Sequence, residues 1–194
     1  MMGFIGSSNP ETTAEYIELL SKAFDGKPYV VEQSTDVAPE MLRAKITEWR
    51  LPGAIIAHDG EVNPQDGRFY LVDGDAVFIT DPVANRTETV PVPALGVPLG
   101  GNFPAMGLAI PIGMNQWRHG MHSLQYGPDG RFYITCALGG TITSFDPKSR
   151  EFKDYPVGGG ALWPHTLRFD GKGVAWFTIS ISNQVGRFDP ASGD

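Results

Sequence analysis

Three histidines stand at corresponding places in the sequence, so their side chains are candidates for one shared site. His122 and His165 are 43 residues apart, and the same step separates Asp146 from Asp189. His58 opens a third, more diverged stretch of the same kind. Imidazoles that converge can bind a metal ion or act as general bases near neutral pH. The alternative is that each histidine caps its own strand by hydrogen bonding to the neighbouring repeat.

Further polar and aromatic residues lie close to these histidines in the sequence. His119 precedes His122 by three residues and could reach the same place, and Arg118 could bind an anionic group. Trp117 and Trp163 flank the histidine positions, where they would either line a pocket or pack between repeats. The candidate ligand-binding residues are therefore His58, Trp117, Arg118, His119 and Trp163.

Short strands in a repeated unit carry these residues. Residues 121–147 and 164–190 align without a gap, and residues 55–93 form the third copy. A repeat of about 40–45 residues built from short strands is typical of a β-propeller blade. The strands expected in one copy are an inner strand at 122–127, a second at 131–136, a third at 141–145 and an outer one at 152–157. Because inner strands line the central channel, the three histidines should meet at one mouth of it.

These patterns predict an all-β chain, a partial β-propeller of about three four-stranded blades with one N-terminal helix. Residues 11–24 (ETTAEYIELLSKAF) carry apolar side chains at helical spacing. The chain divides into an N-terminal helix with a linker (1–44) and the blades (45–194). Residues 94–116 interrupt the repeat and are interpreted as an insertion, either a lid over one face or an ordinary packed excursion.

Composition excludes several kinds of partner. The net charge of −7 without any basic run argues against nucleic acid, since phosphate binding needs clustered lysine and arginine. No run of 18 apolar residues occurs, so no membrane span is expected. One cysteine, Cys136, allows neither an internal disulfide nor a cysteine-based metal cluster. A small-molecule or peptide ligand is the expected partner.

The predicted ring is open. Residues 45–52 (KITEWRLP) alternate like the outer strands expected at 87–93 and 152–157, but no blade precedes them. The last copy lacks its own outer strand. A closed propeller needs four to eight blades, and this chain holds about three. The chain is therefore expected to be a fragment, or to complete its ring by self-association through open blade edges.

The repeat resembles the streptogramin B lyases, the virginiamycin B lyase-like propellers. Their blade reads approximately P-H-x-hydrophobic, then W-F-T, then G-R-F-D-P, then F-T-E followed by an aromatic residue. The matching stretches here are 164–165 (PH), 175–178 (AWFT), 185–190 (VGRFDP) and 46–49 (ITEW). The match covers residues 45–194 and is specific for the repeat class. Sugar-lactonase-like and NHL-type propellers share parts of it.

This resemblance implies a lyase that opens a cyclic depsipeptide by elimination. His122 and His165 would be the catalytic acid or base, and acidic side chains would hold Mg²⁺, a cation that prefers oxygen ligands. The family's acid directly after W-F-T is replaced here by Ile179 and Cys136, which leaves Asp59 and Asp73 as candidate metal ligands. The alternative function is a non-catalytic binding or scaffold propeller.

The resemblance also bears on location and on the N-terminal segment. Members of this class are exported, so a periplasmic or secreted location is expected, although no signal peptide is visible in the chain. Some larger bacterial members carry a c-type cytochrome domain before the propeller, and the helix at 11–24 resembles the closing helix of such a domain. The haem-attachment motif C-x-x-C-H is absent from the chain, so no haem is expected in it.

Overall fold

The computed structural model describes residues 18, 22, 43, 45–158 and 160–194. Two compact units are distinguished, Met1–Thr47 and Glu48–Asp194, and all the described strands lie in the second. The helix expected at 11–24 lies outside the described residues except for Glu18 and Lys22, which are helical and form an ion pair of 2.7 Å. Within the described residues, no helix has both the length and the apolar character needed to cross a membrane.

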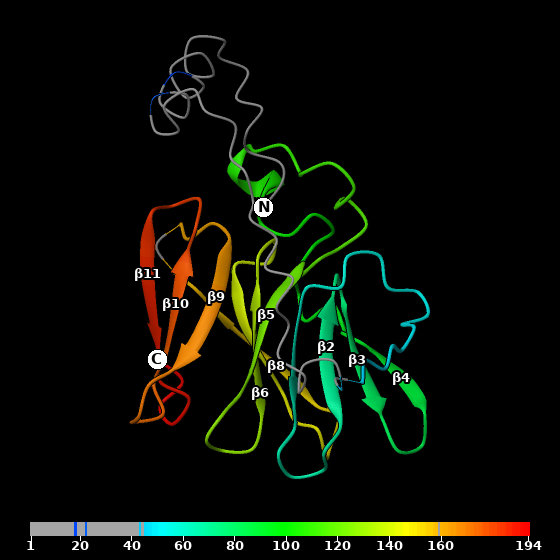
Figure 1. The fold of residues 1–194 in the computed structure, drawn as a ribbon. Helices are drawn as coiled ribbons and strands as arrows, with labels where there is room; N and C mark the ends of the chain where they lie inside the picture. The colour runs from blue at the N-terminus through cyan, green and yellow to red at the C-terminus, as the bar shows by residue number, and fades with distance from the viewer. Residues whose placement is uncertain (1–17, 19–21, 23–42, 44, 159) are drawn as a thin grey trace. The chain divides into compact units, whose positions relative to one another are not determined.

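The described strands form three antiparallel sheets in chain order (Figure 1). Blade 1 consists of β1 (Asp59–Val62), β2 (Phe69–Asp73), β3 (Ala76–Asp81) and β4 (Arg86–Pro91). Blade 2 consists of β5 (Met121–Tyr126), β6 (Phe132–Cys136), β7 (Thr141–Phe145) and β8 (Phe152–Pro156). Blade 3 has only β9 (Pro164–Phe169), β10 (Ala175–Ile179) and β11 (Gln184–Phe188). The prediction of an all-β partial propeller with an incomplete last blade is confirmed.

Glycines at the first turn of each blade explain why the chain reverses where it does. Gly67, Gly130 and Gly173 adopt φ values of 69°, 83° and 80°. Glycine accepts positive φ without a steric penalty, which tight hairpins require. Each turn also contains an aspartate whose carboxylate accepts backbone N–H groups, as Asp129 does from Arg131 at 3.2 Å. Local chemistry therefore fixes the start of β2, β6 and β10.

Blades pack face to face through aromatic and aliphatic side chains. The rings of Tyr70 in blade 1 and Phe132 in blade 2 are stacked with centroids 4.5 Å apart. Tyr133 in blade 2 meets Phe169 in blade 3 edge to face at 5.5 Å. Strands β6 and β7 are buried along their whole length because a blade covers each face of their sheet. Strand β5, which carries His122, therefore belongs to a blade that is packed on both faces, by blade 1 and by blade 3.

The expectation of a strand at residues 45–52 is wrong for this structure. These residues pair with no described strand, and Ile46 and Trp49 are exposed. The alternating pattern is present, but a strand needs a partner edge to satisfy its backbone groups. Residues 45–52 precede blade 1, whose four strands already pair with one another.

The insertion at 94–116 is largely irregular and packs against blade 2. It contains the short 3₁₀ helix η2 (Pro104–Met106). The backbone N–H of Asn102 donates to the carbonyl of Leu138 at 2.9 Å, and its side-chain amide donates to the carbonyl of Gly139 at 2.7 Å. Val97 and Phe103 are buried. The insertion is thus anchored to the loop between β6 and β7.

Candidate functional site

The three histidines come together at the same end of consecutive inner strands. His58 directly precedes β1, and His122 and His165 are the second residues of β5 and β9. The ring centroid of His122 lies 3.5 Å from that of His58 and 3.7 Å from that of His165. The outer two rings are 6.3 Å apart. His122 is therefore the middle member of a contiguous group of imidazoles, called here the histidine cluster.

The strand pairing is irregular where β5 carries His122. The pairing of β5 with β6 shifts register between Met121 and Leu124, so His122 and Ser123 lie in an irregular stretch. The backbone N–H of Ser123 donates to the hydroxyl of Thr135 at 2.9 Å instead of to a ladder carbonyl. Bulges re-aim side chains at strand ends and are frequent next to functional sites.

The cluster is held in the neutral state by its own packing. Burial, followed by the nearby His58 and His165, lowers the pKa of His122 from its ordinary value of 6.5 to about 3. Burial also lowers the pKa of His165 and of His58, although Asp59 opposes the shift at His58. Neutral imidazole offers one hydrogen-bond donor and one acceptor. At neutral pH the cluster therefore presents uncharged polar groups.

The two candidate metal ligands, Asp59 and Asp73, are used for structure. Asp59 Oδ2 accepts from the hydroxyl of Ser123 at 2.9 Å and from the N–H of Leu124 at 3.3 Å. Asp73 Oδ2 accepts from the backbone N–H groups of Ile55 and Ile56. Within the described part of the chain, no three His, Cys, Asp or Glu side chains are arranged to hold a metal ion. These carboxylates do not fit a magnesium site shared with the histidines.

A small cavity of about 40 Å³ lies beside the histidine cluster. Its aromatic wall consists of Trp117 and Trp163, and His58 and His122 contribute the polar groups. Met114 from the insertion completes the apolar wall together with Ile56, Gly74, Gly120, Met121, Ala137 and Leu138. The structure thus brings four of the predicted site residues around one cavity. Met114 was missed because the insertion has no repeat pattern that would place its side chain.

Trp163 is held in an unusual backbone conformation at this cavity. Its φ is 65°, whereas the residue 43 positions earlier is Gly120 with φ 58°. Positive φ is uncommon for a bulky side chain and occurs where the surroundings impose it, often at ligand sites. The ring of Phe103, from the insertion, meets the Trp163 ring at 5.9 Å. The indole is therefore positioned by the insertion as well as by blade 3.

His119 and Arg118 do not line the cavity. The His119 side chain is fully buried, and its Nε2 lies 3.1 Å from Asp154 Oδ2 in the outer strand β8. The Arg118 guanidinium donates to the carbonyl of Val97 at 2.9 Å and so fastens the insertion. The expectation that His119 reaches the channel mouth fails because its ring is directed toward the partly buried Asp154 instead.

Asp75 organises this segment and was not singled out in the sequence. Its carboxylate accepts from the backbone N–H groups of Arg118, His119 and Gly120 at 2.7, 2.8 and 3.2 Å. Asp75 lies in the turn between β2 and β3, which needs no acid for its own geometry. Because the turn does not need an acidic side chain, an aspartate at this position was the signal in the sequence for a contact with a distant segment.

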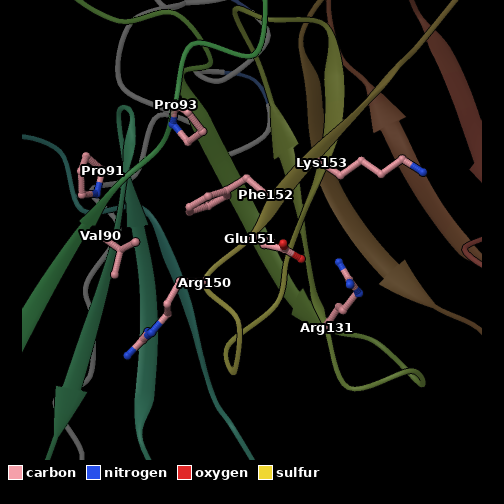
Figure 2. A pocket seen from close by; sticks show the side chains of 8 residues that line it. All are labelled: Val90, Pro91, Pro93, Arg131, Arg150, Glu151, Phe152 and Lys153. Carbon is pink, nitrogen blue, oxygen red and sulfur yellow. The ribbon is translucent and has the colours of Figure 1, made fainter.

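A wider hollow of about 540 Å³ lies between the outer strands of blades 1 and 2 (Figure 2). Its lining comprises Val90, Pro91, Pro93, Arg131, Arg150, Glu151, Phe152 and Lys153. Arg150 donates to Glu88 at 2.9 Å, and Arg131 lies 3.4 Å from Asp146. Because these guanidinium groups already have carboxylate partners, the hollow is a weaker candidate than the cavity at the histidine cluster.

Comparison with solved structures identifies the fold. A catalytically inactive virginiamycin B lyase from Staphylococcus aureus, solved with quinupristin, matches 78% of this chain and 48% of its own at 17% identity and a TM-score of 0.51. A streptogramin B lyase matches 75% of this chain and 44% of its own at 13% identity and a TM-score of 0.54. Hydrazine synthase from Kuenenia stuttgartiensis matches 77% of this chain and 36% of its own at 16% identity and a TM-score of 0.51.

These likenesses show a shared propeller fold. The chain spans less than half the length of these solved structures that it matches. No protein-family model matches the chain, and no curated protein matches it either. The predicted resemblance to the virginiamycin B lyase propellers is confirmed at the level of fold. One fold hosts many functions, so the activity has to be argued from the site.

Proposed function

We propose that the chain forms part of a streptogramin lyase-like propeller that binds a cyclic peptide or a similar ligand at the channel mouth. One observation carries this proposal: the imidazole of His122 contacts those of His58 and His165, from the two neighbouring blades, beside a cavity walled by Trp117 and Trp163. Ligand sites are mostly apolar, with a few polar groups that fix orientation. Two indoles and neutral imidazoles match this description.

The chemistry of the wall favours a ligand with aromatic rings and amides. Indole faces stack on aromatic rings, and neutral imidazoles exchange hydrogen bonds with amide N–H and C=O groups. The cavity itself is too small for a whole peptide, so only one side group would enter it while the rest would lie across the mouth. A cyclic peptide pays less conformational entropy on binding than a linear one does.

A second candidate function is elimination at a carbon–oxygen bond. Its support is the position of His165 in the histidine cluster, where burial lowers its pKa and so leaves the imidazole neutral at pH 7. As general base, His165 would take the proton from the carbon next to the ester-bearing carbon. The C–O bond then breaks, a carbon–carbon double bond forms, and the ring opens to a carboxylate. No step is assigned to magnesium, because Asp59 and Asp73 are engaged elsewhere.

Quinupristin binding tests the first candidate. Tryptophan fluorescence should change on titration, and His122→Ala and Trp163→Ala should each weaken binding at least tenfold, about 1.4 kcal/mol. Lys148→Ala, in an exposed turn of blade 2, is the matched control and should bind like the parent. Equal affinity in the parent and both site variants would show that the cavity does not bind this ligand class.

Mass spectrometry of the same mixtures separates binding from catalysis. Elimination opens the ring without a change in mass and shifts the retention time, whereas hydrolysis adds one water. If the elimination product forms, His165→Ala should abolish it while the fluorescence response persists. A product that forms at the same rate with His165→Ala excludes His165 as the base. If quinupristin stays unchanged in all samples, the elimination activity is excluded and only the proposed binding function remains.

A further inference from the structure

The strand pairing of blade 2 sets one residue against two at the position of His122. Strands β5 and β6 shift in register so that His122 and Ser123 lie opposite Thr135 alone. In such a two-against-one bulge the ladder of backbone hydrogen bonds is interrupted. The N–H of Ser123 donates to the hydroxyl of Thr135 at 2.9 Å instead. Thr135 is 0% exposed, so this hydroxyl is the partner that the backbone group has in place of water.

Blade 3 repeats this arrangement at His165. Strands β9 and β10 shift in register so that His165 and Thr166 lie opposite Thr178 alone. The backbone N–H of Thr166 donates to the hydroxyl of Thr178 at 3.3 Å. The Thr166 hydroxyl lies 2.9 Å from Nδ1 of the His165 ring. In both blades a threonine hydroxyl therefore supports the residue that follows the histidine.

Blade 1 has neither the threonine nor the shift. Val72 occupies the position of Thr135 and Thr178 in the repeat, and β1 pairs with β2 in one continuous register. The backbone N–H of His58 donates directly to the carbonyl of Val72 at 3.1 Å. Threonine and valine are both β-branched residues that favour strands, so strand propensity does not explain the difference. The hydroxyl occurs where the pairing is irregular, and valine occurs where it is regular.

Thr135 also reaches the next blade. Its hydroxyl donates its hydrogen to the carbonyl of His165 in β9. Strands β5 and β9 lie side by side as inner strands of adjacent blades (Figure 1). One hydroxyl thus accepts from the backbone next to His122 and donates to the backbone of His165. The rings of these two histidines are the ones that lie 3.7 Å apart.

We propose that Thr135 and Thr178 are positioning residues of the histidine cluster, whose hydroxyl groups hold the two bulges and so keep the imidazoles of His122 and His165 in contact. Neither threonine lines the cavity, so both act through the histidines. A buried N–H or C=O without a partner is costly, and a satisfied buried network fixes one geometry. Without these hydroxyl groups each bulge has to rearrange, and the imidazole that it carries moves with it.

The two consequences of this inference are separable. The effect of the threonines on the imidazoles is a property of the ligand-free chain. Their effect on affinity rests on the proposed function, because it requires a ligand at the channel mouth. The first consequence is therefore measured without any ligand and the second with quinupristin.

Carbethoxylation by diethyl pyrocarbonate, read by tandem mass spectrometry of peptides, measures the access of reagent to each imidazole. Thr135→Val removes both hydrogen bonds and keeps the branched shape of the side chain. We expect the reaction rates of His122 and His165 to rise at least about threefold, because local opening exposes the rings. Thr135→Ser keeps the hydroxyl and should react like the parent. His119 is fully buried, serves as the internal reference and should stay protected.

Thr178→Val is the milder and more selective variant. It removes the bond to the N–H of Thr166, so the rate should rise at His165 and remain that of the parent at His122. A general loss of structure would raise both rates together. This variant decides the question if Thr135→Val does not fold.

Thr80→Val is the matched control. It removes a buried hydroxyl that pairs with Thr87 at 3.0 Å, between two strands of blade 1 that carry no histidine. All histidine rates should equal those of the parent. Parent rates at both clustered histidines in the folded valine variants of Thr135 and Thr178 overturn the proposal. An equal rise in Thr135→Ser also overturns it, because the hydroxyl would then not be the cause.

Quinupristin affinity distinguishes a failure of this inference from a failure of the proposed function. Where the parent binds, Thr135→Val should weaken binding at least tenfold, about 1.4 kcal/mol, and Thr135→Ser should bind like the parent. A parent that binds no quinupristin, with histidine rates that respond as expected, contradicts the proposed function and supports the positioning role. A parent that binds, with rates and affinity unchanged in the folded valine variants, overturns the positioning role alone.

Discussion

The ring of His122 lies 3.7 Å from that of His165, centroid to centroid, although the two residues are 43 positions apart in the chain. The contact arises because β5 and β9 are inner strands of adjacent blades and begin at the same end. His58 adds a third ring from blade 1 at 3.5 Å from His122. Protonation of any one ring must occur next to another imidazole and partly away from water. The cluster is consequently a polar group that favours the neutral state.

The stability of the chain should fall with acid because of His122. Its pKa is about 3 in the folded chain and 6.5 in the unfolded chain. Between these values the unfolded chain binds more protons, so the free energy of unfolding decreases as pH falls from 6.5 toward 3. A change from pH 7 to 4 should cost about 1–2 kcal/mol, and His122→Phe should reduce this loss. Urea unfolding at pH 7, 5.5 and 4 measures both. The same pH dependence in parent and variant would contradict the assignment.

The convergence of the histidines could be predicted from the sequence because it follows from the repeat. Equal spacing places His122 and His165 at equivalent points, and equivalent points of inner strands meet at the channel. Gly130 and Gly173 set the same turn in both copies, so no long-range information was needed. The incomplete third blade followed from the same alignment.

The rest of the site depends on contacts between distant segments, and the sequence pattern does not encode them. His119 is close to His122 in the chain, but Asp75 and Asp154, from two other strands and turns, determine where it lies. Asp59 follows His58, yet its carboxylate is used by Ser123 of the next blade. Residues 46–52 have the pattern of a strand, but a pattern alone supplies no partner edge. In each case the local sequence pattern is present, and the difference between expectation and structure comes from tertiary contacts that are made or missing.

The Asp59 side chain should stabilise the contact between blades 1 and 2. Asp59→Asn weakens the hydrogen bonds to Ser123 and to the N–H of Leu124, so we expect a loss of about 1–2 kcal/mol in the free energy of unfolding. Asp194→Asn, at an exposed carboxylate, is the control and should change stability by less than about 0.5 kcal/mol. If Mg²⁺ raised the melting temperature of the parent and not that of Asp59→Asn, the carboxylate would be a metal ligand after all.

Gly120 should tolerate no side chain. A Cβ there would lie 2.7 Å from Leu138 Cγ, and φ is 58°. Gly120→Ala therefore combines the cost of positive φ with a steric clash, and we expect a loss of about 2–3 kcal/mol. Gly67→Ala separates the two effects, since Gly67 has φ 69° and open space around it; its cost should be about 1 kcal/mol. Denaturant midpoints measure the difference. Equal losses would mean that Leu138 moves aside at little cost.

The pair of His119 and Asp154 should stabilise the fold without contributing to ligand binding. His119 is fully buried, and Asp154 accepts from it and from the hydroxyl of Thr143. His119→Leu leaves the carboxylate without one of its partners, and we expect a loss of about 2–4 kcal/mol in the free energy of unfolding. Asp154→Asn and the double variant complete a thermodynamic cycle, in which a coupling of at least about 1 kcal/mol is expected for side chains in direct contact. Quinupristin affinity, measured where each variant is folded, should be unchanged. A variant His119→Leu that unfolds like the parent but loses the ligand would move His119 back into the site at the channel mouth.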